Sequence, residues 1–140
     1  MPGIDECLLE AMRLPGSLGA AVVDWTSGLA LGTIGDSPNN DHEATAAETA
    51  ELARMAAEHP AFAPSEPGAG KQAGASTAAP PKGLPVEDVI VTTRTGYHVL
   101  RFVETTFDSS VFLHLWLDRD EGNLALARLR LRDIAERLVL

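Results

Sequence analysis

The side chains that could carry chemistry in this chain are few and scattered. The four histidines, His42, His59, His98 and His114, include no pair at the i and i+4 spacing of a helical metal site. The single cysteine, Cys7, excludes a Cys-Cys ligand pair, and its place on an apolar helical face indicates a small core residue. Serine, histidine and aspartate all occur, but no serine lies in a nucleophile-elbow motif. The sequence therefore predicts no enzyme, no metal site and no cofactor.

Two short stretches resemble ligand-binding loops without having their spacing. Gly68-Ala69-Gly70-Lys71 lacks the first glycine, the following Ser or Thr and the preceding strand of a phosphate-binding loop. The stretch from Asp118 resembles a calcium loop, but Asn123 stands where the glycine belongs and Leu129 where the bidentate glutamate belongs. We expect a turn there instead, with Asn123 as the N-cap of the last helix.

The composition fits one domain with room for a core. The chain has 140 residues, of which 45% are hydrophobic, and its net charge is −9. That charge argues against nucleic acid or a membrane surface as a partner bound by bulk attraction. The acidic N-terminus lacks the basic and apolar regions of a signal peptide. No apolar run approaches the roughly 18 residues of a membrane span. A single cysteine suits a reducing compartment. We expect a cytoplasmic protein.

The acidity belongs to the first half of the chain. Residues 1–66 hold 11 acids and 2 bases, whereas residues 67–140 hold 9 of each. The second predicted helix carries five of these acids and one of the two bases. An acidic helix face is most often a solvated one, and the alternative is a docking surface for a basic partner.

Five strands should position these side chains. Three follow one another at Val86–Thr93, Tyr97–Val103 and Val111–Leu117, and a hairpin of Leu18–Trp25 with Leu29–Ile34 precedes them. The last of the five has apolar residues on both faces, so it should lie at the centre of the sheet, covered on both sides.

Three helices complete the predicted order. The first is Asp5 to Leu14, the second Asp41 to Glu58, and the third begins after Asn123. At 100° per residue the second helix divides into arcs. An apolar arc holds Thr45, Leu52, Met55 and Ala56, a stripe of small residues holds Ala46, Ala50, Ala53 and Ala57, and the opposite arc holds Glu43, Ala47, Glu51, Arg54 and Glu58. The alanine stripe could lie flat on the chain's own sheet, or it could also pack against a second subunit.

The segment from Pro60 to Pro85 differs from everything around it. It contains six prolines and only two large apolar residues, Phe62 and Leu84. Such a segment cannot bury enough surface to offset its ordering entropy, so residues 60–85 are predicted to be a flexible loop inserted into a single domain of residues 1–140.

The order helix, strand, strand, helix, three strands, helix resembles the roadblock family. The likeness also rests on the hairpin around Gly19 to Leu29, the alanine-rich second helix and the three closing strands. It implies an α+β fold in which a five-stranded antiparallel sheet has helices on both faces, the three-layer arrangement of roadblock and profilin-like proteins. It further implies a non-enzymatic dimer that works with a small Ras-like GTPase as a regulator or scaffold. The long insertion departs from the family pattern.

The resemblance also implies where the partners bind. In the family the third strand meets its twin, and this strand carries no proline or lysine that would protect an edge. The expected homodimer interface comprises four strand residues and four helix residues: Val89, Ile90, Val91, Thr92, Ala46, Ala50, Ala53 and Ala57. We expect the GTPase to contact the outer arc of the second helix, at Glu43, Glu51, Arg54 and Glu58.

A second hypothesis comes from a different class of protein. A five-stranded sheet of the PAS or profilin-like kind could bind a small ligand near His98, His114 and Trp116. The apolar character of both sheet faces favours the interaction module, because a sensor needs a vacant cavity.

Overall fold

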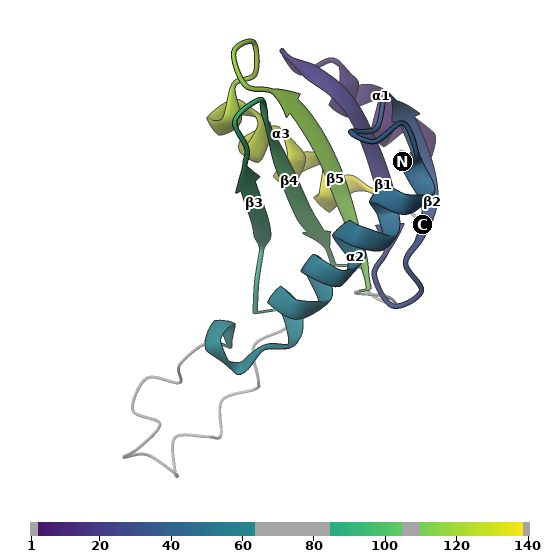
Figure 1. The fold of residues 1–140 in the computed structure, drawn as a ribbon, viewed down its shortest axis with the longest axis vertical. Coiled ribbons are helices and arrows are strands. Elements are labelled where there is room, and N and C mark those ends of the chain that lie inside the picture. Colours follow the sequence, from purple (N-terminus) through teal and green to yellow (C-terminus); the bar gives the residue numbers. More distant parts are fainter. Residues whose placement is uncertain (1–2, 64–84, 105–109, 139–140) are drawn as a thin grey trace.

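The computed structural model describes residues 3–63, 85–104 and 110–138. Its five strands form one antiparallel sheet in the order β2-β1-β5-β4-β3 (Figure 1). The strands are β1 (Ser17–Asp24), β2 (Leu29–Gly35), β3 (Asp88–Thr92), β4 (Gly96–Val103) and β5 (Val111–Asp118). The helices are α1 (Ile4–Met12), α2 (His42–Glu58), the short 3-10 helix η1 (Pro60–Phe62) and α3 (Leu124–Arg137). The predicted fold class and order of elements are confirmed.

The sheet separates two apolar cores. On one face α1 and α3 cover the sheet, and the buried set there includes Cys7, Leu8, Leu115, Leu131 and Ile134. On the other face α2 lies across the strands, as Figure 1 shows, over Ala21, Val23, Leu100, Phe102 and Phe112. The three-layer arrangement follows from strands that are apolar on both sides.

The central place of β5 confirms the prediction from its sequence. β5 pairs with β1 on one side and with β4 on the other. Leu113, Leu115 and Leu117 are buried under α1 and α3, whereas Phe112 and His114 are buried on the α2 side. Because both edges of β5 are paired, its backbone groups are satisfied even though the strand is buried on both faces.

Local signals place the helix ends and the close contacts. Asp41 caps α2, since its Oδ1 accepts from Glu43 N at 3.0 Å and from Ala44 N at 3.1 Å. Asn123 caps α3 by accepting from Leu126 N at 3.0 Å, as predicted. Gly32 lies directly beneath α1, where an added Cβ would come within 2.6 Å of Ile4 Cγ2.

Some boundaries differ from those expected. β3 begins at Asp88 rather than at Val86, and Pro60–Phe62 forms η1 instead of loop. Most of the predicted loop, residues 64–84, lies outside the described residues. The sequence pattern places Met55 in the apolar arc of α2, but its side chain is 56% exposed. Met55 lies close to Glu51 on the helix surface rather than over the sheet.

Candidate interaction surfaces

The outer edge of β3 has no neighbour within the described part of the chain. Thr93 N donates to Gly96 O at 2.8 Å, and Phe102 N donates to Glu87 O at 3.1 Å. In an antiparallel register, alternate residues turn their backbone groups toward the partner strand, so the odd-numbered residues of β3 pair with β4. The N–H and C=O groups of Asp88, Ile90 and Thr92 therefore point away from the sheet.

The side chains of β3 divide between the molecule's own core and its surface. Val89 packs on the α2 side, and Ile90 packs on the side of α1 and α3. Val91 and Thr92 are exposed. Among the four predicted interface residues of this strand, only Val91 and Thr92 can offer much side-chain surface to another molecule. The backbone groups of Ile90 and Thr92 are available as well.

An apolar groove adjoins this edge. It lies between α2 and the strands β3 and β4, has a volume of about 340 Å³, and its walls include Leu52, Val91, His98 and Leu100. Val91 belongs both to the groove and to the open edge, so the two features form one continuous surface.

The alanine stripe of α2 faces the chain's own sheet. Ala46, Ala50 and Ala53 are 0–2% exposed and pack with Val23 and the residues around it. Their small side chains let α2 lie close to the chain's own sheet, which is the first of the two expected packings, and their contact with a second subunit stays a prediction. Ala57 is half-buried at the end of the stripe, and its role at an interface stays a prediction.

The outer arc of α2 carries the predicted carboxylates. Glu43, Glu51 and Glu58 are exposed, and so is Glu48. Arg54 differs from them, since it is half-buried and its Nη1 donates to the carbonyl oxygen of Trp25 at 3.0 Å. This hydrogen bond links α2 to Trp25 at the end of β1, and contact of Arg54 with a partner stays a prediction.

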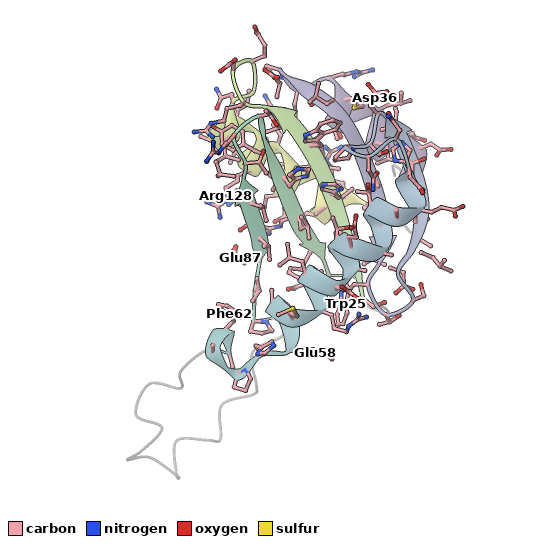
Figure 2. The ribbon with its side chains drawn as sticks, viewed as in Figure 1. Trp25, Asp36, Glu58, Phe62, Glu87 and Arg128 are labelled. Carbon is pink, nitrogen blue, oxygen red and sulfur yellow. The ribbon has the colours of Figure 1, made fainter. Side chains whose placement is uncertain are left out.

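Two exposed apolar side chains lie with these carboxylates and were missed from the sequence. Met55 is 56% exposed between Glu51 and Glu58 on the helix surface, and Phe62 is 56% exposed on η1. Figure 2 shows Phe62 and Glu58 together at the end of α2 nearest η1. The signal for Met55 was available, since at 100° per residue it lies only 40° from Glu51. We call Glu43, Glu48, Glu51, Met55, Glu58 and Phe62 the α2 outer surface.

The buried histidine is satisfied inside the core. His114 Nε2 and His98 Nδ1 lie 2.9 Å apart, and the two rings stack with centroids at 5.2 Å. Burial, together with the nearby His98 and His42, lowers the pKa of His114 to about 3. Burial also lowers the pKa of His98. Both imidazoles are therefore neutral at pH 7 and share one hydrogen bond.

The hypothesis of a ligand beside His114 and Trp116 gains little from the geometry. The cavity that touches both residues holds only about 10 Å³, which is about the smallest space that accepts one water molecule. The larger apolar groove reaches His98 but neither His114 nor Trp116. The arrangement indicates a structural histidine pair.

The described residues contain no cluster of metal ligands and no membrane-spanning helix. Within ranges 3–63, 85–104 and 110–138, no three His, Cys, Asp or Glu side chains are placed to hold a metal ion. No helix in the same ranges is long and apolar enough to cross a bilayer.

Comparisons with known proteins identify the fold. No protein-family model matches the chain, and no curated protein sequence matches it significantly. The chain is similar to the solved structure of Myxococcus xanthus MglB, with a TM-score of 0.64 and 18% identity over 95% of this chain and 82% of that one. It is also similar to a Roadblock/LC7 domain from Streptomyces avermitilis, with a TM-score of 0.61 and 16% identity over 96% of this chain and 93% of that one. The chain therefore has the roadblock/LC7 fold, which confirms at the level of fold the resemblance seen in the sequence.

Proposed function

We propose that this chain is a non-enzymatic homodimeric adaptor or regulator and that a small Ras-like GTPase docks on its α2 outer surface. The roadblock/LC7 fold supports the class of protein. The observation that carries the proposal is the open edge of β3, which continues into an apolar groove and lies on the same molecule as an exposed acidic helix.

The open edge supports assembly through β3. Two copies of β3 that pair antiparallel about a twofold axis would join the two sheets into one and would satisfy the outward backbone groups of Asp88, Ile90 and Thr92. Val91 and the groove beside it would then be covered on each side of the axis. In this arrangement both α2 helices lie on the same face of the joined sheet, so the two α2 outer surfaces form one broad acidic face.

The composition of the α2 outer surface suits a protein partner with a basic rim. Glu43, Glu48, Glu51 and Glu58 contribute no contact to the core, since all four are exposed. Carboxylates at the rim of an interface mainly raise the association rate, whereas apolar side chains at its centre supply most of the affinity. Met55 and Phe62 are placed to be those central side chains.

The α2 outer surface carries no arginine that could reach into the active site of a bound GTPase. The only arginine on α2, Arg54, is held by the Trp25 carbonyl. An effect on nucleotide hydrolysis would therefore come through the partner's own switch loops, which a docked protein can order or displace.

A binding experiment with matched variants tests the proposal. Purified small GTPases encoded in the same genome, loaded with GDP or a non-hydrolysable GTP analogue, are passed over the immobilised wild-type chain, two test variants and two control variants. Glu51→Lys with Glu58→Lys should slow association about tenfold and weaken its salt dependence. Met55→Ala should mainly speed dissociation.

The controls make the same chemical changes elsewhere on the surface. Asp120→Lys with Glu121→Lys reverses two exposed acids in the β5–α3 turn, and Leu129→Ala truncates a side chain that is 52% exposed on α3. Both should change GTPase binding less than about twofold, because they lie away from α2. Equal loss in test and control variants, or no binding by any small GTPase of that genome, would contradict the proposal.

A further inference from the structure

The first half of α3 is a basic surface on an acidic protein. From Leu124 to Arg132 the helix carries Arg128, Arg130 and Arg132 and no carboxylate, whereas the whole chain has a net charge of −9. All three arginines are exposed. Arg128 pairs with Asp88 at 2.7 Å, while Arg130 and Arg132 have no ion-pair partner within the described residues. Two guanidinium groups are thus presented to the outside.

An exposed leucine stands among these arginines, with a hollow on each side of the helix. Leu129 is 52% exposed. Toward β3 lies a hollow of about 240 Å³ that Arg128, Leu129 and Arg132 help to line. Figure 2 shows Arg128 and Glu87 beside β3 on this flank. Toward α1 lies a larger groove of about 530 Å³. The first half of α3 is therefore a ridge between two depressions.

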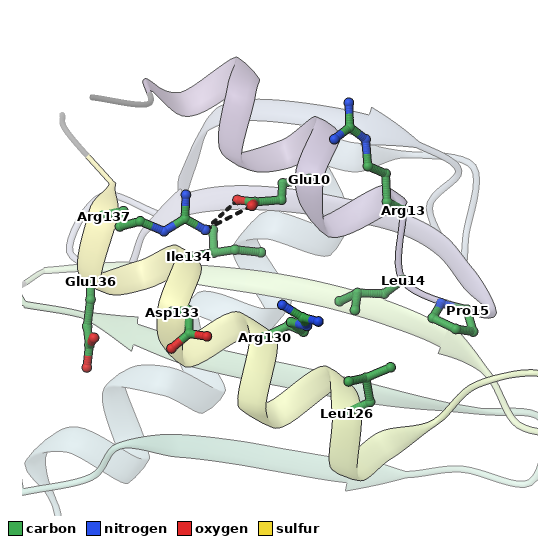
Figure 3. A pocket seen from close by; sticks show the side chains of 10 residues that line it. All are labelled: Glu10, Arg13, Leu14, Pro15, Leu126, Arg130, Asp133, Ile134, Glu136 and Arg137. Carbon is green, nitrogen blue, oxygen red and sulfur yellow. Dashed lines mark hydrogen bonds and ion pairs between the residues drawn. The ribbon is translucent and has the colours of Figure 1, made fainter.

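The groove toward α1 is apolar at one end and closed by an ion pair at the other. Figure 3 shows Leu14 and Leu126 at the same end of the groove, with Arg130 beside them. At the other end Arg137 Nη2 bonds both carboxylate oxygens of Glu10, at 2.9 and 2.7 Å. The carboxylates of Asp133 and Glu136 come from the second half of α3 and lie toward that closed end (Figure 3). The open end is thus lined by leucines and positive charge.

The hollow toward β3 contains an arginine with one unmet hydrogen-bond donor, and it is lined by the paired carboxylates of Glu87 and Asp88 as well. Arg101 of β4 lines this hollow, and its side chain is only 14% exposed. Its Nε is buried and has no partner within the described residues. Its Nη1 lies 3.7 Å from Glu87 Oε2 in an ion pair, and the Glu87 side chain is 73% exposed. The Arg101 guanidinium group is only weakly paired, so a carboxylate that reached its 14% exposed surface would gain a charge-assisted hydrogen bond there.

We propose that this ridge, formed by Arg128, Leu129, Arg130 and Arg132 with Arg101 at its flank, is a docking surface for an acidic amphipathic segment of another protein. Carboxylates of the segment would meet Arg101, Arg130 and Arg132, and its apolar side chains would lie beside Leu129 and in the end of the groove formed by Leu14 and Leu126. A lipid surface is the poorer fit, since three arginines cannot offset the net negative charge of the chain near an anionic bilayer. The surface lies across the sheet from α2, so this inference does not depend on the proposed GTPase site.

A designed peptide tests the surface without knowledge of the natural partner. The probe is a fluorescein-labelled amphipathic helix of about 15 residues with leucines at i, i+3, i+4 and i+7 and glutamates elsewhere. One control peptide replaces the glutamates by lysines, and another replaces the leucines by serines. Fluorescence anisotropy with the full chain should show at least about tenfold tighter binding of the acidic leucine peptide than of either control.

Protein variants locate the binding. Arg130→Glu with Arg132→Glu should weaken binding of the acidic peptide at least about tenfold, and Leu129→Ser at least about threefold. Arg94→Glu with Thr95→Glu makes a comparable charge change at two exposed residues of the β3–β4 turn, off the ridge and the groove, and should alter binding less than about threefold. Circular dichroism melts should be the same for all these variants, since the changed side chains are exposed.

Several outcomes would overturn the inference. It is wrong if the lysine peptide binds as well as the acidic one, or if Arg130→Glu with Arg132→Glu leaves binding unchanged. It is also wrong if the chain prefers vesicles of phosphatidylglycerol and phosphatidylcholine to the peptide, since this would identify the ridge as a membrane contact.

Discussion

Thr92→Pro should separate the proposed dimer without unfolding the subunit. The N–H group of Thr92 points away from β4, and its side chain is exposed, so proline removes only an outward donor. In a twofold interface the change acts twice. Each lost hydrogen bond, with the acceptor it leaves unpaired, costs about 1–2 kcal/mol, which gives about 2–4 kcal/mol per dimer. The dimer dissociation constant should then rise about 30- to 1,000-fold.

The neighbouring position provides a sharp contrast. Val91 lies opposite His98 and turns its N–H toward β4, so Val91→Pro should break a bond within the subunit and lower its thermal stability. Thr92→Val keeps the N–H group and should behave like the wild type. The assays are light scattering coupled to size exclusion, for mass, and circular dichroism, for stability.

Two results would refute the reasoning. If Thr92→Pro remains a dimer with the wild-type dissociation constant, then β3 is not the joining edge. If the wild-type chain is a monomer at micromolar concentration, then the homodimer itself is wrong.

The remaining predictions concern stability. Ala53→Leu should lower the free energy of unfolding by about 1–3 kcal/mol, because Ala53 is 0% exposed on the face of α2 that packs on the sheet. Ala47→Leu on the exposed side of α2 should change it by less than about 0.5 kcal/mol, and equal effects in urea unfolding would contradict the packing of α2. Burial holds the pKa of His114 at about 3 in the folded chain, against 6.5 in the unfolded chain. Between these two values the unfolded chain takes up this proton and the folded chain does not, so the free energy of unfolding decreases as the pH is lowered. From pH 7 to pH 5 the free energy of unfolding should decrease by about 2 kcal/mol, and most of this decrease should be absent in His114→Phe. An equal decrease in both proteins would show that His114 does not cause it. Replacing Ala63–Lys82 by a short Gly/Ser linker should change the free energy of unfolding by less than about 1 kcal/mol, because the segment has few core-forming residues; a large fall in the thermal midpoint would show that it packs.

The order of the elements could be predicted because its signals are local. Asp41 and Asn123 cap the helices that follow them, and both caps are recognisable from residue type alone. The central place of β5 followed from apolar residues on both of its faces. These features depend on neighbours within a few residues of each other in the chain.

The details of the candidate surfaces could not be predicted because they depend on distant partners. Arg54 has the same periodicity as the glutamates around it, but its partner is the carbonyl oxygen of Trp25, 29 residues away. No residue pattern marks a backbone group as an acceptor. The alanine stripe posed a similar problem, since small side chains favour close approach without saying whether the approaching surface belongs to the same chain.

The sheet lies between two surfaces of opposite charge, and this arrangement bears on how two partners would share the molecule. The α2 outer surface presents four glutamates on one face, and the ridge on α3 presents three arginines on the other. Between them lie two apolar cores on either side of one sheet, with Phe112 and Leu113 of the same strand pointing in opposite directions. The sheet and the two cores separate the charged surfaces by more than the roughly 8 Å over which exposed charges interact at physiological salt. Binding on one face should therefore neither attract nor exclude a partner on the other by charge alone. Coupling between the two proposed sites, if measured, would have to pass through a change in the packing of β5 or in the pairing of β3.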